Sequence, residues 1–518
     1  MERRVQFAAL VVGALFAQVA LVAQPALAQD GAPADDWGGD DSALGGDDFG
    51  FASAATPTEV AAPPPAPREQ SWHLGGFVRS DWGVWAERLG GASGFDEDAL
   101  AKARQSLDLW LRWKSGRLRA QISGHHEFDP VWDRAALARD APTWREYASL
   151  TQVRESYVAA SLGAVELTVG RQIVAWGEGD MQSPLDVVNP RDMREPGLAD
   201  LVDLRLPVLA TRAGWFHGNH TVEAIVVHEA NFGLRATPMG PFSPLPALLL
   251  DNDTVRNLGK AGIDVEAQLR AKEIAWQHGF DDASERYGAD AQQLFVRWLH
   301  RGEGLDLGLY LASALDQQGA MDPAGFGDMA ALLMAERIDL PLQHRRFTLA
   351  GTSGAWVNGS WLLKWELALV PDKRFNTGDT SALPPKLEVT ERAAVAAMAG
   401  LTWKATSTTT VGVEIARTTL IDAPADLIFP VDAPMLAGRL MHRAVHDRLI
   451  FVAAASAFGL QAEYGWLARG EVRWDFGDGV QAGVGAISYQ PGDEFGPLAG
   501  LDRHDRVFGQ LRWDFQAR

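Results

Sequence analysis

The sequence contains no cysteine among its 518 residues. Neither a disulfide framework nor a thiolate nucleophile or metal ligand is therefore available. Beyond residue 28, no stretch reaches the roughly 18 consecutive apolar residues that a membrane-spanning helix requires. A mature chain that crosses a membrane must then do so with strands. The formal net charge of −20 argues against a general nucleic-acid partner, because phosphate binding depends on lysine and arginine.

The first residues have the features of an export signal. Arg3 and Arg4 give a positive start, residues 7–22 form an apolar run, and Ala26, Leu27 and Ala28 end in a small-residue cleavage site. The sequence therefore predicts a signal peptide over residues 1–28 and export into a Gram-negative cell envelope.

Residues 29–70 carry much of the negative charge. This segment contains nine acidic residues against Arg68 alone, and it is rich in glycine, alanine and proline. Segments of this composition bury too little apolar surface to fold. We predict a disordered acidic linker, whose paired aspartates lack the ligand spacing of a calcium loop.

From residue 71 to residue 518, the strongest pattern is alternation of apolar and polar residues with a period of two. Such alternation places one set of side chains on one face of a sheet and the rest on the other. Leucines at 305, 307, 309 and 311 alternate with polar or small residues, and Leu363, Trp365 and Leu367 enclose Lys364 and Glu366. One face is apolar and the other is charged, which predicts an all-β fold.

The lengths of the connections indicate which all-β fold this is. Seven very short connections, for example Ser115-Gly116 and Gly477 to Gly479, alternate with eight long ones, among them 176–205, 230–290 and 420–465. Tight turns at one rim and long loops at the other are typical of an outer-membrane barrel. Fifteen connections predict a transmembrane antiparallel barrel of about sixteen strands, with long extracellular loops partly filling the lumen. The apolar run 449–455 would make the count odd, so we assign it to a loop helix or to a segment folded into the lumen.

Aromatic residues agree with this fold. Nineteen tryptophans, with Trp72, Trp82 and Trp403 as examples, fit girdles at the two membrane interfaces. The last strand alternates up to Phe515, and it resembles the C-terminal signal of barrels inserted by the outer-membrane assembly machinery. Gln516, Ala517 and Arg518 follow the phenylalanine, which departs from that signal.

The most distinctive motif runs from Gly170-Arg171-Gln172 through Trp176-Gly177-Glu178 to Asn189-Pro190 and Asp192. In this order it resembles a family of Gram-negative outer-membrane proteins that is catalogued as a domain of unknown function. The family is often found with resistance-nodulation-division exporters of hydrophobic compounds. The resemblance rests on about 25 residues and implies a barrel that transports apolar molecules. It brings no catalytic residue with it.

The same motif supplies the candidate site. Val165, Leu167 and Val169 have the lipid-facing parity, which leaves Arg171 facing lipid unless Gly170 forms a β-bulge or the arginine lies at the rim. Arg171 could then pair with Glu178, Asp186 or Asp192. The candidates for a lumen or constriction site are Arg171, Gln172, Trp176, Glu178, Asp186, Asn189 and Asp192. The alternative is that these residues only anchor an inward-folded loop.

Motifs of soluble enzymes are missing: neither a zinc-binding His-Glu-x-x-His nor a Gly-x-Ser-x-Gly elbow occurs. We predict no catalytic residue, no metal and no cofactor. The expected function is an outer-membrane channel or transporter for small, hydrophobic or aromatic solutes, acting alone or with periplasmic or inner-membrane transport components. An unselective porin and a barrel hydrolase are the alternatives. The expected partners are outer-membrane lipid and a small-molecule solute.

Overall fold

A computed structural model describes residues 70–88, 99–138, 142–198, 204–250, 253–326, 334–379 and 386–517. Within them, eighteen strands form one sheet whose first and last strands also pair with each other. These strands are β1 (Gln70–Trp85), β2 (Leu100–Ser115), β3 (Leu118–Phe128), β4 (Ser149–Leu162), β5 (Val165–Gln172), β7 (Val208–His217), β8 (His220–Val227), β11 (Gln293–Arg301), β12 (Leu305–Leu315), β15 (Arg346–Asn358), β16 (Trp361–Asp379), β17 (Lys386–Lys404), β18 (Thr409–Leu420), β19 (Met435–Ala444), β20 (Leu449–Phe458), β21 (Trp466–Gly477), β22 (Val480–Gln490) and β23 (Arg506–Ala517).

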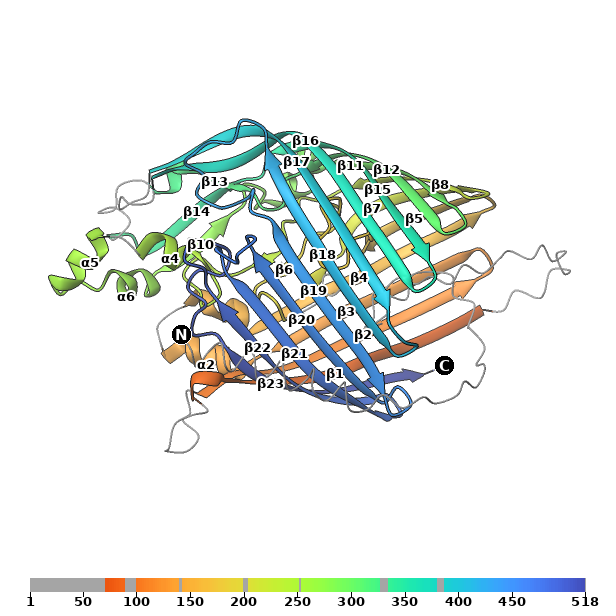
Figure 1. The fold of residues 1–518 in the computed structure, drawn as a ribbon, viewed down its shortest axis with the longest axis horizontal. Coiled ribbons are helices and arrows are strands. Elements are labelled where there is room, and N and C mark those ends of the chain that lie inside the picture. Colours follow the sequence, from red (N-terminus) through yellow and green to blue (C-terminus); the bar gives the residue numbers. More distant parts are fainter. Residues whose placement is uncertain are drawn as a thin grey trace, which may run out of the picture.

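The sheet is a closed, up-and-down antiparallel barrel (Figure 1). Each strand pairs with its neighbours in chain order, and β1 closes the ring against β23 over twelve residue pairs from Leu74 to Trp85. Closure leaves no strand with an unpaired edge, so strand N–H and C=O groups find their partners within the ring. This confirms the prediction of an antiparallel barrel.

The two faces of the wall have the polarity that the alternation predicts. Leu309, Leu311 and Val413 are more than half exposed on the outside of the ring. Lys364 and Glu366 point inward and are 6% and 2% exposed. Burying these charges on the inside spares them contact with an apolar exterior, where a charge costs several kcal/mol by order of magnitude.

Tryptophans gather on the outside near the short turns. Trp361 and Trp403 stack across β16 and β17 with ring centroids 5.3 Å apart, and Trp72 lies 6.0 Å from Trp113 across β1 and β2. Trp82 lies toward the opposite end of β1. Indole rings are amphipathic, so tryptophans near the two ends of the strands suit the two boundaries between an apolar layer and water.

The predicted count of sixteen strands is wrong, because residues 435–458 form the hairpin of β19 and β20. Residues 449–455 are therefore part of a wall strand and not of a loop helix or an inward segment. The hairpin turns at Val445, His446 and Asp447, all at φ between +54° and +62°. These residues replace the glycine that usually marks such a turn, so the sequence gives no turn signal. With two strands added, the count remains even.

One predicted loop is partly a strand, and one predicted long connection contains helices and strands of its own. Residues 371–379 continue β16 after a register shift between Val370 and Lys373, although the sequence predicts a loop over 371–387. The long connection after β8 contains α4 (Leu245–Leu250), α5 (Asp253–Lys260), α6 (Val265–Arg270), β10 (Glu273–Gln277) and α7 (Ala283–Arg286). Strand β10 pairs in parallel with β14 (Arg337–Gln343), which also pairs with β13 (Ala320–Met321).

These elements form a separate layer at the long-loop end of the barrel. Helices α4 to α6 lie beside β10 and β14 at the left of Figure 1. Their apolar side chains share a core that includes Leu248, Leu269, Ile274 and Leu340. Helix α2 (Pro130–Ala138) follows β3, and the two-residue strands β6 (Asp192–Met193) and β9 (Leu234–Arg235) pair with each other. Short 3₁₀ helices complete the connections at Ala86–Arg88, Pro142–Tyr147, Ala289–Ala291 and Pro323–Phe326.

Among the described residues, no helix has both the length and the apolar character needed to cross a membrane. The predicted signal peptide (1–28) lies outside the described residues. So does the predicted linker (29–70), apart from Gln70, which begins β1.

Candidate functional site

The candidate site lies in the connection from β5 to β7, residues 173–207, of which 199–203 are not described. Gly170, near the end of β5, has φ +133°, and a Cβ there would lie 2.3 Å from the carbonyl oxygen of Ser156. A glycine is therefore required where β5 meets β4. The register of β5 against β4 and β7 continues without a shift through Arg171.

Arg171 keeps the outward parity and lies next to the last residue of β5, so of the two expected alternatives the structure has the position at the strand end and not the bulge at Gly170. Its guanidinium donates to Glu229 Oε2 at 3.0 Å and to the carbonyl of Pro207 at 2.7 Å. The predicted pairing with Glu178, Asp186 or Asp192 is wrong, because the partner comes from the connection after β8. Asp186 instead contacts Arg191 and Arg205, and Asp192 contacts Arg194.

Asn189 ties the two ends of this connection together. It is completely buried, and its Oδ1 accepts a hydrogen bond from Val174 N at 2.7 Å. Its Nδ2 donates to the carbonyls of Gln172 and Leu206, at 3.2 and 2.8 Å. Gln172 is also buried and donates from its side chain to Ala210 O. Asn189 therefore supplies hydrogen-bond partners to the backbone at both ends of the connection, and Gln172 adds a bond to β7.

Trp176 is also completely buried, so it packs in the interior and does not line an open path. Its ring makes edge contacts with Phe295 and Tyr310, at centroid distances of 5.9 and 5.5 Å. Arg297 lies over the indole at 4.8 Å and donates to the carbonyl of Ala175. These contacts hold the start of the connection against β11 and β12.

The next residues are held by two carboxylates that the candidate list does not contain. Glu366 on β16 accepts hydrogen bonds from the backbone N–H groups of Glu178, Gly179 and Leu185, at 2.5–3.0 Å. Glu366 also accepts from the hydroxyl of Ser183, at 3.0 Å. The alternation places Glu366 inward, but nothing in the sequence indicates that its partner is the backbone of residues 178–185.

Glu414 on β18 makes the second set of contacts. Its carboxylate accepts from the N–H groups of Asp180, Met181 and Gln182, at 2.8–2.9 Å. Lys364 on β16 forms an ion pair with Asp180 at 2.8 Å. Hydrogen bonds to a charged acceptor contribute about 1.5–3 kcal/mol each. Residues 178–185 are therefore fixed to the inner face of β16 and β18.

The far end of the connection is fixed to the opposite part of the ring. Glu195 forms ion pairs with Arg104 on β2 at 2.7 Å, with Arg506 on β23 at 2.9 Å and with Lys102 at 3.1 Å. Burial alone would raise the pKa of Glu195, but the three cations hold it well below its usual range. Glu195 therefore stays charged at neutral pH.

Three further contacts strengthen this end. Arg194 pairs with Glu127 on β3 at 2.8 Å, and the hydroxyl of Tyr489 on β22 donates to the carbonyl of Pro196 at 2.6 Å. Arg469 on β21 donates to the carbonyl of Leu198. The connection thus contacts inward-facing residues of β16 and β18 at one end and of β2, β3 and β21 to β23 at the other.

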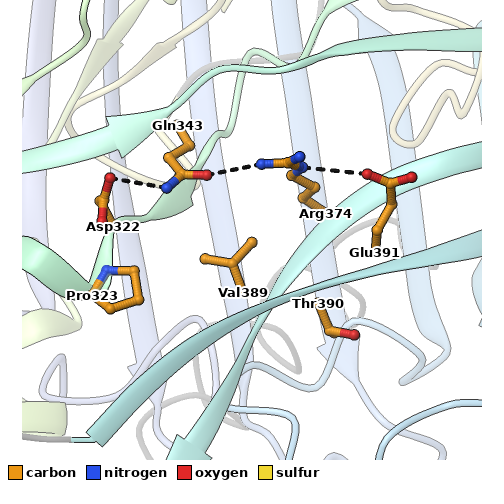
Figure 2. Close-up of a pocket in the computed structure, with 7 residues that line it drawn as sticks. All are labelled: Asp322, Pro323, Gln343, Arg374, Val389, Thr390 and Glu391. Atoms are coloured by element: carbon orange, nitrogen blue, oxygen red, sulfur yellow. Dashed lines mark hydrogen bonds and ion pairs between the residues drawn. The ribbon is translucent and has the colours of Figure 1, made fainter.

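A pocket of about 430 Å³ lies away from this connection, between β14 and the extended hairpin of β16 and β17 (Figure 2). Four of its polar side chains form one hydrogen-bonded chain from Asp322 through Gln343 and Arg374 to Glu391. None of the seven predicted site residues lines it. Among the described residues, no group of three or more histidine, aspartate or glutamate side chains is arranged to hold a metal ion.

The fold is similar to solved outer-membrane proteins at very low sequence identity. OccAB1 of Acinetobacter baumannii has a TM-score of 0.45 and 10% identity, covering 86% of this chain and 96% of that one. OccK9 (OpdG) of Pseudomonas aeruginosa has a TM-score of 0.44 and 12% identity, covering 86% and 98%. OmpF of Salmonella typhi, solved in complex with daunomycin, has a TM-score of 0.38 and 6% identity, also covering 86% and 98%.

None of the curated proteins compared with the chain matches it. A family model does match, over residues 104–513, and its description is "Protein of unknown function (DUF1302)". The matched region begins in β2 and ends in β23, so it covers most of the barrel as well as the connection from β5 to β7. The chain therefore belongs to the DUF1302 family.

Proposed function

We propose that this protein spans the outer membrane as a channel or transporter for small solutes, and that the connection from β5 to β7 narrows its lumen. A closed ring with an apolar exterior and charged interior residues supports the membrane assignment. Charged side chains on the inside of such a ring avoid contact with hydrocarbon.

The observation that carries the proposal is the pair of carboxylates Glu366 and Glu414. Together they accept hydrogen bonds from six backbone N–H groups of residues 178–185. A loop that only capped the rim would not need acceptors on the inward face of two wall strands. Fixing a polar backbone segment to the inside of a barrel creates a constriction, and its lining then selects what passes.

The finer proposal concerns the solute and the partners. We propose that the solute is small with a hydrophobic or aromatic part, and that the barrel works with an inner-membrane exporter, as the family resemblance implies. We also propose transport without catalysis. An unselective porin would give a large, steady conductance, whereas a gated transporter would stay mostly closed. A barrel hydrolase would cleave detergent-solubilised lipid, and a single serine or histidine substitution would abolish that activity.

The absence of cysteine gives a clean test of the constriction. Gln182 is half-buried, and its backbone N–H donates to Glu414. A cysteine at this position keeps that backbone hydrogen bond. Gln182→Cys, reconstituted in a planar bilayer and treated with a negatively charged thiosulfonate, should lose at least about half of its current if residue 182 borders the path. The control is Leu460→Cys, because Leu460 is 68% exposed in the connection from β20 to β21.

Wild-type protein should not respond to the reagent. Equal responses of the two cysteine variants would contradict the constriction. Absence of any current from wild type and from both variants would contradict a conducting channel and favour the gated transporter.

A further inference from the structure

The hairpin of β16 and β17 projects past the closed wall at the long-loop end and borders a pocket there. Strand β15 pairs with β16 no further than Leu369, whereas β16 and β17 pair with each other as far as Asp379. The pocket of about 430 Å³ lies beside this projecting part, against β14 and the 3₁₀ helix Pro323–Phe326 (Figure 2). It therefore lies beyond the paired wall.

The elements around the pocket are held to one another. Asn376 on β16 is buried, and its side chain accepts from Met321 N at 2.9 Å and donates to Met321 O at 2.8 Å. A Cβ at Gly325 would lie 2.4 Å from Cδ of Pro341 on β14, so a glycine is required where the 3₁₀ helix meets this strand. The pocket is therefore formed before any ligand binds, as is usual for small-molecule sites.

One side of the pocket is a row of four planar polar groups. The amide of Gln343 donates to Asp322 Oδ2 at 2.9 Å and accepts from Arg374 at 3.0 Å, and Arg374 Nε lies 3.4 Å from Glu391. Each contact orients the next group in the row. Carboxylate, amide and guanidinium groups present their donors or acceptors in pairs, which can bind two neighbouring hydroxyl groups of a ligand.

The row keeps capacity for further hydrogen bonds. Within the described part of the chain, Arg374 Nη2 makes no hydrogen bond and the Gln343 amide uses one of its two N–H groups. The hydroxyl of Thr390 also has no hydrogen-bond partner among those residues. The side chains of Arg374 and Glu391 are 29% and 55% exposed, so a ligand can reach them.

The other side of the pocket is apolar. Figure 2 shows the rings and branches of Pro323 and Val389 across from the polar row. A sugar ring has the matching distribution, because its hydroxyl groups point outward from its edge while its C–H groups form apolar patches on its faces. Such a ring can bind the polar row and pack on the proline and the valine at the same time.

The charges of the pocket favour a neutral ligand. One guanidinium, that of Arg374, lies between the carboxylates of Asp322 and Glu391. An anionic ligand would be repelled by both carboxylates, and a cationic ligand would be repelled by the guanidinium. A hydroxyl group can donate to a carboxylate and accept from a guanidinium, and it adds no charge.

We propose that this pocket binds a neutral saccharide of one or two sugar units through Asp322, Gln343, Arg374 and Thr390. Its volume lies in the range of small-molecule sites, about 300–1,000 Å³. In the proposed orientation the long-loop end faces the outside of the cell. The saccharide there can be a free sugar or part of the sugar chain of lipopolysaccharide. The inference does not depend on the proposed channel, because the pocket lies beyond the wall.

The test is isothermal titration calorimetry of the full-length protein in lauryldimethylamine oxide, a detergent without a sugar headgroup. The neutral probes are galactose and maltose. Galacturonate and galactosamine are the charged probes, used in a slightly acidic buffer that keeps the amine protonated. Wild type should bind galactose at least about threefold more tightly than either charged derivative.

Two variants test the polar groups. Arg374→Met removes the guanidinium and should weaken the binding of the neutral sugars at least about fivefold, and Thr390→Val should weaken it at least about twofold. Arg337→Met is the matched control and should bind as wild type does. Arg337 lies on β14 in the same layer, forms exposed ion pairs with Glu273 and Asp339, and does not line the pocket.

The outcomes decide the inference without bearing on the channel. Absence of binding by both neutral sugars, or tighter binding of a charged derivative than of galactose, overturns it. Wild-type affinity in Thr390→Val together with wild-type affinity in Arg374→Met also overturns it. If Arg374→Met does not fold, Thr390→Val alone decides. Tighter binding of oligosaccharide released from lipopolysaccharide than of maltose supports the inference with the membrane's own sugar as ligand, and the reverse order supports it with a free sugar.

Discussion

The side chain of Asn189 takes the place of a neighbouring strand for Val174, because its Oδ1 accepts a hydrogen bond from Val174 N at 2.7 Å. The wall ends at Gln172, so the backbone of residues 173 and 174 has left the sheet. The same amide closes the loop by donating to Gln172 O and Leu206 O. One buried side chain therefore sets the path along which the chain leaves the wall and returns to it.

Asn189→Ala should loosen this connection. The substitution leaves three buried backbone groups without this partner, and each unsatisfied group costs about 1–3 kcal/mol. We expect faster cleavage within residues 173–207 by an added protease, with the barrel strands still protected. Asn219→Ala, in an exposed short turn, should match wild type. Equal cleavage rates for the two variants would show that Asn189 does not hold the connection.

Glu195→Ala should destabilise the barrel more than most single changes. Arg104, Lys102 and Arg506 would keep their buried charges without the shared carboxylate, and breaking a buried ion pair in this way costs about 3–5 kcal/mol. The measurement is the temperature at which the folded barrel unfolds in detergent. Combining Glu195→Met with Arg506→Met should restore part of the loss, because fewer buried charges lack a partner. A double variant less stable than Glu195→Ala would contradict this account.

Two histidines lie next to each other in the long-loop layer, and we predict that they make it sensitive to acid. His278 Nδ1 lies 2.8 Å from His344 Nε2, and Phe232 stacks on His344 at 3.5 Å between ring centroids. Burial lowers the pKa of His278 to about 4 and that of His344 to about 3, and Arg235 adds to both effects. Both rings are therefore neutral in the folded protein at pH 7.

The direction in which pH changes the stability of the long-loop layer follows from these lowered pKa values. An exposed histidine in an opened layer takes up its proton near pH 6.5, whereas the folded layer does not until about pH 4. The stabilisation of the folded layer by these neutral histidines is complete above pH 6.5 and declines as the pH falls toward 4. We expect faster proteolysis of residues 228–292 at pH 5 than at pH 7.5. His344→Gln should reduce that difference, and an undiminished difference would rule out the histidine pair as its source.

The sequence predicts the wall of this protein better than its interior. Alternation along a strand depends on which side faces water, so residues such as Leu309, Lys364 and Glu366 reveal their face locally. The sequence does not predict the hairpin of β19 and β20, because its turn has no glycine or proline. The turn is formed by Val445, His446 and Asp447. Local patterns therefore succeed where the environment is periodic and fail where the turn chemistry is unusual.

In the candidate site, too, the sequence shows the local motif but not its long-range partners. The motif that contains Asn189 and Trp176 is visible in the sequence, and both residues are completely buried in the connection from β5 to β7. The partners of this connection, Glu366, Glu414 and Arg506, lie 181 to 311 residues further along the chain from the groups they bind. Such contacts exist only after the ring closes. No spacing in one sequence records them, which is also why the partner of Arg171 is Glu229 and not a residue of its own motif.

The central claim is that the connection from β5 to β7 narrows a path through the barrel, and Glu366→Gln/Glu414→Gln tests it most directly. Each amide replaces an acceptor oxygen with a donor that faces the N–H groups of residues 178–185, so the segment should detach from the wall. In single-channel recordings the double variant should conduct at least about twofold more than wild type and with larger fluctuations. Glu391→Gln changes an exposed carboxylate at the long-loop end and serves as the control. Conductance and fluctuations identical to those of wild type in the double variant would contradict the claim.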